Sequence, residues 1–190
     1  MATKVRLAIF DPEHYEEDRM VLGGWDETQV TGEKPHKYKK VYFSSGKDNW
    51  ETPNDLFERY NSRYSFVLDA AADSKNAKVA SYFGPGGLEE DALTADWGPW
   101  LQKGNIWLNP PYSRGLQKKF IEKAVNEKAK LDPHHHGLGH VVCLLPARTD
   151  TKLFHEIIKP YAADIEFLKG RIKFVGAEHG APFPSMVVIF

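Results

Sequence analysis

A short apolar run that ends in two consecutive prolines, between residues 105 and 112, constrains this chain more than any other segment. Asn105-Ile106-Trp107-Leu108 has the composition and length of a buried strand. Asn109-Pro110-Pro111-Tyr112 follows, and a strand cannot continue through it because each proline lacks a ladder N–H and has a fixed φ. We therefore expect a stiff loop at the carboxyl edge of a sheet, which is where open α/β sheets bind their ligands.

This loop presents an amide beside an aromatic ring, which suits a planar group that carries an NH2. The Asn109 side-chain oxygen and the Pro110 carbonyl can each accept a hydrogen bond from this NH2, while Tyr112 can stack on the planar ring that carries it. Such bonds favour a tetrahedral nitrogen whose lone pair can attack a sulfonium methyl, a transfer that depends mainly on positioning. The segment, Pro111 included, resembles the signature of amino-methyltransferases that use S-adenosylmethionine. A proline-rich turn with an Asn cap and a buried Tyr is the structural alternative.

Strands and helices alternate along the chain from residue 50 onward. The helix nearest the N-terminus is expected to have Thr52 as its cap and Pro53 at its first position. Residues 165–168 and 171–175 flank Lys169-Gly170 as in a tight hairpin. The alternation predicts an α/β fold with a mostly parallel sheet and a C-terminal β-hairpin. The expected strands are 64–68, 105–108, 140–146 and 186–190, the expected helices 52–60, 116–130 and 154–158, and short elements are expected at 69–72 and 78–83.

The length and composition are those of an ordinary soluble domain. The 190 residues are enough for one domain with a substantial core, and 42% of them are hydrophobic and 27% charged. Residues 1–46 are polar and weakly periodic, so we interpret them as an extension before a domain at 47–190. No apolar run approaches the ~18 residues that cross a bilayer, no signal-peptide core is present, and the single cysteine, Cys143, lies in an apolar run. These features predict a cytoplasmic protein.

The charge of the chain excludes a histone-like, unspecific nucleic-acid binder, because the net charge is only −1. Basic residues still cluster at 34–40, at 114–130 and around Arg171, and each cluster is either a solvated face or part of a nucleic-acid surface. The run His134-His135-His136 does not predict a metal site. Three consecutive histidines cannot easily converge on one ion, and no Cys or carboxylate completes a tetrahedral set.

The expected strand 64–68 leads into Asp69-Ala70-Ala71-Ala72, a candidate cofactor loop. Small residues such as Ala71 let a ligand approach the backbone, and the Asp69 carboxylate suits a cation such as the α-ammonium of a methionine moiety. The alternative is an Asp that caps a helix of alanines. Asp91, or its rival Asp96, could accept a hydrogen bond from a cofactor adenine. The helix start at Trp50, Thr52 and Pro53 could hold the cofactor carboxylate, since helix N-termini favour anions.

Seven blocks of the sequence together resemble the phage-type DNA N6-adenine methyltransferase family, the small Dam-like enzymes of phages and prophages. They span residues 46–190 in the order of the family. They are Asp48-Asn49-Trp50-Glu51-Thr52-Pro53, Leu68-Asp69-Ala70-Ala71-Ala72 with Asn76-Ala77-Lys78, Tyr82-Phe83, Ile106-Trp107-Leu108-Asn109-Pro110-Pro111-Tyr112, Leu145-Pro146-Ala147-Arg148-Thr149-Asp150-Thr151, Gly170-Arg171-Ile172-Lys173-Phe174, and Phe183-Pro184-Ser185.

The resemblance implies a class I S-adenosylmethionine-dependent methyltransferase of Rossmann-like fold. It implies S-adenosylmethionine as the methyl donor, duplex DNA as the substrate and a bacterial host cell. Two departures stand out: the alanine loop lacks the usual Gly-x-Gly, and only about 40 residues separate Asp69 from Asn109. That spacing is short for two strand–helix units, so we expect a sheet abbreviated on the cofactor side.

Three further residues are candidates for contacts with DNA. Arg148 leaves the strand 140–146 at the same sheet edge as Asn109, where it could meet a phosphate or a base edge. Arg171 is the second candidate. Phe174 could form the other face of a sandwich around a base swung out of the duplex, although Phe183 competes for that role and either could be a core residue.

The sequence predicts methyl transfer to adenine N6 in DNA, and two alternatives remain open. The acceptor could instead be RNA or a protein glutamine, and with a protein substrate the basic flanks would not matter for activity. The chain could also be a DNA-binding relative that has lost catalysis, as the missing glycine loop suggests.

Overall fold

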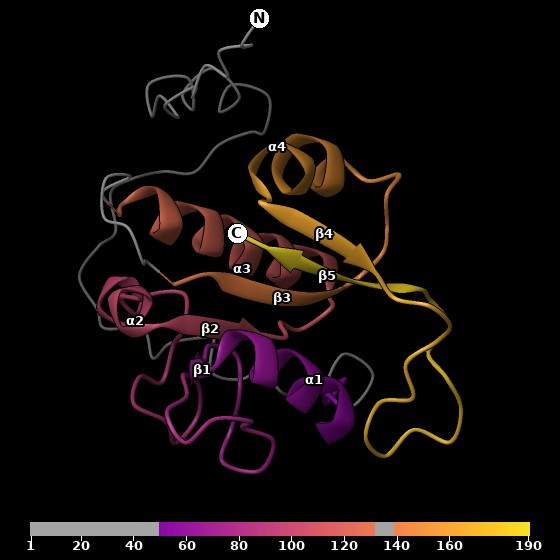
Figure 1. Cartoon of the computed structure of the whole chain (residues 1–190), viewed down its shortest axis with the longest axis horizontal. Coiled ribbons are helices and arrows are strands. Elements are labelled where there is room, and N and C mark those ends of the chain that lie inside the picture. Colours follow the sequence, from indigo (N-terminus) through magenta and orange to yellow (C-terminus); the bar gives the residue numbers. More distant parts are fainter. Residues whose placement is uncertain (1–49, 132–138) are drawn as a thin grey trace, which may run out of the picture. The chain divides into compact units, whose positions relative to one another are not determined.

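The computed structural model describes residues 50–131 and 139–190, which form one five-stranded sheet with helices around it (Figure 1). The extension 1–46, the basic cluster 34–40 and the histidines at 134–136 lie outside the described residues. The elements, in chain order, are α1 (Asn54–Tyr64), β1 (Phe66–Asp69), α2 (Gly98–Lys103), β2 (Asn105–Leu108), α3 (Arg114–Ala129), β3 (Val141–Pro146), the π-helix η3 (Leu153–Ile158), α4 (Lys159–Tyr161), β4 (Asp164–Phe167) and β5 (Ser185–Ile189).

The strands of the sheet lie in the order β1-β2-β3-β5-β4. β1, β2 and β3 pair in parallel, and β5 is antiparallel to both of its neighbours, so four of the five strands run in one direction. The mixed α/β sheet with mostly parallel strands is therefore confirmed. Because the parallel strands end at one edge, the loops that follow β1, β2 and β3 meet there.

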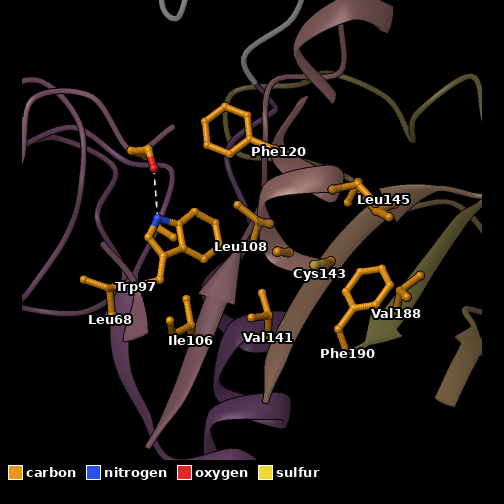
Figure 2. Packing of buried hydrophobic residues seen from close by; sticks show 14 of the residues in the cluster. Leu68, Trp97, Ile106, Leu108, Phe120, Val141, Cys143, Leu145, Val188 and Phe190 are labelled. Carbon is orange, nitrogen blue, oxygen red and sulfur yellow. Dashed lines mark hydrogen bonds between the residues drawn. The ribbon is translucent and has the colours of Figure 1, made fainter. Parts of the chain in front are cut away.

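Alternating residues of the strands build two apolar layers, one on each face of the sheet. α3 covers one face and α1 the other (Figure 1). In β2, Ile106 and Leu108 face the α3 side and belong to the same cluster as Phe120, and Trp107 faces the α1 side, where it contacts Phe57. All six residues of β3 are buried, as expected of a strand covered on both faces. Figure 2 shows the α3-side layer around Cys143.

The cofactor side of the sheet is short, as the spacing between Asp69 and Asn109 predicts. β1 is the edge strand, and the described segment 70–97 contains no regular helix or named strand. Isolated bridges join Asp69 to Tyr82 and Phe83 to Glu89. The Trp97 indole, fully buried, donates to the Ala92 carbonyl at 2.9 Å and fills the space beside β1 (Figure 2).

The structure corrects three expectations about helices. α1 begins at Asn54 with Pro53 as its N-cap, and Thr52 is a buried residue that makes no capping bond. Residues 70–72 form no helix and the chain bends at residues 70 and 71, because the Asp69 carboxylate accepts the Ala71 N–H and holds the backbone in a turn. The helix expected at 154–158 is the π-helix η3, and Pro160, which has no N–H to continue an α-helical ladder, follows it. α2 had not been predicted.

The tight hairpin predicted at Lys169-Gly170 is wrong. β4 pairs with β5, and a long loop, residues 168–184, joins them. Gly170 does turn the chain with φ +82°, but residues 171–174 form no strand. The Val175 N–H instead donates to the Glu51 carbonyl at 3.0 Å, and Phe174 is buried on the α1 side. The antiparallel pair at the C-terminus therefore exists with a different second strand.

Within residues 50–131 and 139–190, no helix has the length and apolar composition to span a membrane.

Candidate active site

The candidate site lies at the edge where β1, β2 and β3 end. Asp69 closes β1, Asn109 follows β2 directly, and Ala147-Arg148 leave β3. Asp69 pairs with Trp107, so β1 and β2 end within one residue of each other, while β3 continues three residues beyond Cys143, the partner of Leu108. The predicted catalytic and cofactor loops therefore emerge side by side, as expected of an open sheet whose ligands bind at this edge.

Of the two polar groups of the Asn109 amide, only the nitrogen makes a hydrogen bond within the described part of the chain. Its Nδ2 donates to the Trp50 carbonyl at 2.6 Å, across 59 residues of sequence. Its Oδ1 is buried and has no hydrogen-bond partner among the described residues. A buried acceptor without a donor costs about 1–3 kcal/mol, so this oxygen is an oriented and unsatisfied acceptor. Pro110, the next residue, is also buried and is the second predicted acceptor through its carbonyl.

Tyr112 lies in an aromatic cluster with Trp50, Phe174 and Phe183. The Tyr112 ring meets Phe183 edge-on at 5.7 Å between centroids and Phe174 at 6.1 Å, while Trp50 contacts both phenylalanines. Its hydroxyl donates to the Leu144 carbonyl at 3.2 Å. Only 5% of the residue is exposed, and this burial raises the pKa of Tyr112 well above its ordinary value. A base that stacks on this ring must therefore displace one of the phenylalanine edges.

The Asp69 carboxylate is buried and bonds to the chain's own backbone. Its Oδ2 accepts the Lys78 N–H at 3.0 Å and its Oδ1 the Ala71 N–H at 3.3 Å. Desolvation by burial raises the pKa of Asp69 to about 6, even though both hydrogen bonds and the Lys78 charge act in the opposite direction. Asp69 thus organises the loop 70–78 that follows β1. Its predicted contact with a cofactor ammonium stays a prediction.

A small pocket lies between the loop after β1 that contains Ala70-Ala71-Ala72, here called the alanine loop, and the loop after β2 that contains Pro110-Pro111, the proline loop. Ala71 and Pro111 line it together, and the remaining lining residues are Phe83, Gly84, Glu90, Ala92 and Phe120. Gly84 has φ +136°, and a Cβ there would lie 2.0 Å from the Ala72 carbonyl oxygen, so only glycine fits this close approach. Glycine at position 84 therefore lets this segment pack closely on the alanine loop, and the pocket that remains has room for about one water molecule.

The acidic residues predicted to meet a cofactor adenine make local turns. Asp91 Oδ1 accepts the Leu93 N–H at 2.9 Å, and the exposed Asp96 accepts the Gly98 N–H at 3.0 Å, just before α2. The acid that lines the pocket is Glu90. Glu89, Glu90 and Asp91 are consecutive acids, so the sequence contained no signal that would single out Glu90.

The segment Trp50-Pro53, which precedes α1, contacts the loop after β2 directly. Besides the Trp50 carbonyl, it includes Glu51, whose carboxylate lies 3.1 Å from Lys78 Nζ. The same Lys78 ammonium donates to Asn54 Oδ1 at 2.8 Å. The structure therefore brings Trp50 into contact with Asn109. It also places Lys78 beside this segment, although in the sequence Lys78 was only part of a block that resembles the family.

A cavity of about 750 Å³ opens beside the end of β3, between α3 and η3. Arg148 lines it together with Lys118 and Lys152, and the carboxylates of Asp150 and Glu156 also contribute. Arg171 is exposed on the loop 168–184 and is not among the lining residues. The two predicted DNA-contacting arginines thus occupy different parts of the surface. In the described part of the chain, no group of three or more His, Cys, Asp or Glu side chains is placed to hold a metal ion.

Comparisons with known proteins show to which family the chain belongs. Residues 40–189 match the family model described as DNA N-6-adenine-methyltransferase (Dam). The chain is 29% identical over 150 residues to the DNA N-6-adenine-methyltransferase of Escherichia phage T1, an alignment that covers 70% of this chain and 56% of that protein. It is 36% identical over 87 residues to "Putative methyltransferase YfdM" of Escherichia coli K12, covering 44% of this chain and 87% of that protein. The chain thus spans about half the length of the phage T1 relative.

Proposed function

Because this chain belongs to the DNA N-6-adenine-methyltransferase (Dam) family, we propose that it transfers a methyl group from S-adenosylmethionine to N6 of an adenine flipped out of duplex DNA. The observation that carries the proposal is the Asn109 amide. Its nitrogen is bonded to the Trp50 carbonyl, and its oxygen is buried without a donor among the described residues. An adenine amino group supplies the missing donor.

The chain contributes positioning and hydrogen-bond acceptors to this reaction. Asn109 Oδ1 and the Pro110 carbonyl accept the two N6–H bonds, and the nitrogen becomes tetrahedral with its lone pair free. S-adenosylmethionine supplies an activated methyl on a sulfonium, and the sulfur keeps the electron pair when the carbon–sulfur bond breaks. The methylated nitrogen then loses one proton to solvent. Pro111 keeps the loop stiff, and Tyr112 stacks on the base once the aromatic cluster has opened.

The cofactor is assigned to the pocket between the alanine and proline loops. Ala71 and Pro111 line this pocket, which has room for about one water molecule, so binding of the cofactor requires the two loops to move apart. Asp69, Asp91 and the helix start with Trp50, Thr52 and Pro53 are the remaining candidates for cofactor contacts. The direct bond between Trp50 and Asn109 supports a role for that helix start next to the reacting atoms.

DNA contacts are assigned to Arg148, Arg171 and Phe174. Arg148 shares its cavity with Lys118 and Lys152, so three cations surround one opening beside the end of β3. Neutralised phosphates release counterions, and binding should therefore weaken steeply as salt rises. Phe174 belongs to the aromatic cluster around Tyr112, the position from which it could face a flipped base.

The test is methyl incorporation from tritiated S-adenosylmethionine into unmethylated duplex DNA, followed by digestion to nucleosides. We expect the label in N6-methyl-2′-deoxyadenosine. Binding of the cofactor without label in DNA would assign the acceptor to RNA or protein, and the same assay on RNA and on glutamine-containing peptides would identify it. DNA binding without measurable cofactor affinity in calorimetry would identify a relative that has lost catalysis.

A further inference from the structure

Lys78 is a largely buried cation that the proposed reaction does not use. Only 10% of its side chain is exposed, and its ammonium lies 3.1 Å from Glu51 Oε1 and 2.8 Å from Asn54 Oδ1. Its backbone N–H donates to Asp69 Oδ2 at 3.0 Å. The residue therefore connects the loop after β1 with the segment that precedes α1.

That segment also holds the catalytic amide. The Trp50 carbonyl accepts the Asn109 Nδ2–H at 2.6 Å, and the next carbonyl, that of Glu51, accepts the Val175 N–H at 3.0 Å. Two consecutive carbonyls thus bind the proline loop and the loop 168–184. The Glu51 side chain is the group through which Lys78 can fix both carbonyls.

We propose that Lys78 is a positioning residue, whose ion pair with Glu51 fixes the Trp50 carbonyl and thereby keeps the Asn109 amide oxygen turned toward the methyl-accepting nitrogen. The inference rests on the proposed function, since it concerns the same amide. An Asn side chain can rotate by half a turn and exchange its donor and acceptor ends. In the exchanged state an NH2 would face the NH2 of the substrate, and no lone pair would be freed.

An ion pair elsewhere in the structure offers a comparison. Arg59 on α1 lies 2.6 Å from Glu166 on β4 and joins these two elements. Arg59 is 62% exposed, and none of its described bonds reaches the proline loop or the aromatic cluster. Loss of this pair should therefore affect stability without affecting the chemistry.

The experiment compares Lys78→Met, Glu51→Gln and the double variant with Arg59→Met in the full chain. For each we would measure kcat for DNA methylation, KM for DNA, the Kd for S-adenosylmethionine by calorimetry, and the thermal unfolding temperature. Since a misplacement of about 1 Å at a reacting group can cost about 100-fold in rate, we expect kcat to fall at least ~10-fold in Lys78→Met. The cofactor Kd should stay within about twofold, because the Lys78 backbone N–H that holds Asp69 is kept.

The double variant and a conservative variant separate positioning from folding. Lys78→Met and Glu51→Gln should not be additive in kcat, because they remove the same contact, and Lys78→Arg should retain most of the rate. Equal kcat values for Lys78→Met and Arg59→Met would overturn the inference, as would fully additive losses. If Lys78→Met does not fold, Glu51→Gln and Lys78→Arg carry the same comparison. Absence of DNA methylation by the wild-type protein would refute the proposed function, a result distinguishable from these.

Discussion

Replacing the Asn109 amide by a carboxyl group, in Asn109→Asp, changes one heavy atom of the candidate site. Oδ1 remains an acceptor, but the group that donates to the Trp50 carbonyl at 2.6 Å becomes an oxygen. When the introduced carboxyl is ionised, two acceptors face each other in a site where Oδ1 is already buried without a partner among the described residues. Protonation restores a donor. Burial and the Trp50 carbonyl therefore both raise the pKa of the introduced carboxyl.

The expected loss follows from the bond that is removed. The hydrogen bond contributes about 1 kcal/mol, and a buried carbonyl without a donor costs about 1–3 kcal/mol more. A total of about 2–4 kcal/mol acting against the productive orientation lowers kcat between roughly 30-fold and roughly 900-fold at pH 8, since 1.36 kcal/mol is a factor of ten. The loss should shrink as the pH falls, because the protonated carboxyl again donates to Trp50.

The assay is single-turnover methylation of duplex DNA with saturating S-adenosylmethionine between pH 6 and pH 8.5, expressed as the ratio of variant to wild type. Asp69, whose pKa is raised to about 6 by burial, titrates in both proteins and cancels in the ratio. Asn109→Ala is the control: it should lose at least ~100-fold at every pH, because alanine has no group to protonate. A ratio near one at pH 8, or a ratio for Asn109→Asp that does not rise toward pH 6, would refute the reasoning.

Three further predictions concern the surroundings of this amide. Burial raises the pKa of Asp69 from 3.8 to about 6, so the folded protein holds that proton more tightly than the unfolded chain, and up to about 3 kcal/mol of stability present below pH 4 is lost as the pH rises to about 6. Asp69→Asn should remove this dependence from thermal unfolding curves, and an unchanged dependence would assign it to another group. Tyr112→Phe should lower the free energy of unfolding by about 1–2 kcal/mol, because the Leu144 carbonyl loses its donor. Its kcat should stay close to that of the wild type, since the ring is kept, and a large drop would mean that the hydroxyl takes part in the reaction. Arg148→Ala should weaken DNA binding and reduce the salt slope of the binding constant by about one, without a change in cofactor affinity; an unchanged slope would remove Arg148 from the DNA surface.

The central strands could be predicted because their signals are local. Residues 141–146 are apolar throughout and buried on both faces, and residues 105–108 end where the prolines begin. The short segment between Asp69 and Asn109 likewise predicted a sheet that ends at β1. The false hairpin at Lys169-Gly170 shows where local signals fail. Its turn glycine is present, but the N–H of Leu168 bonds to the Ser185 carbonyl and that of Val175 to the Glu51 carbonyl, so distant partners decided the pairing.

The orientation of the Asn109 amide depends on the same class of long-range contacts. Asn109 could be singled out from its motif, but the group that turns it is the Trp50 carbonyl, 59 residues away. A backbone carbonyl is present at every position, so no residue type at position 50 could reveal it. The contacts next to that carbonyl, between Lys78 and the side chains of Glu51 and Asn54, are long-range as well. A lysine is costly to bury unless it is paired, but its partners become known only when the fold brings residues 51, 54 and 78 together, so these contacts could not be predicted from the sequence.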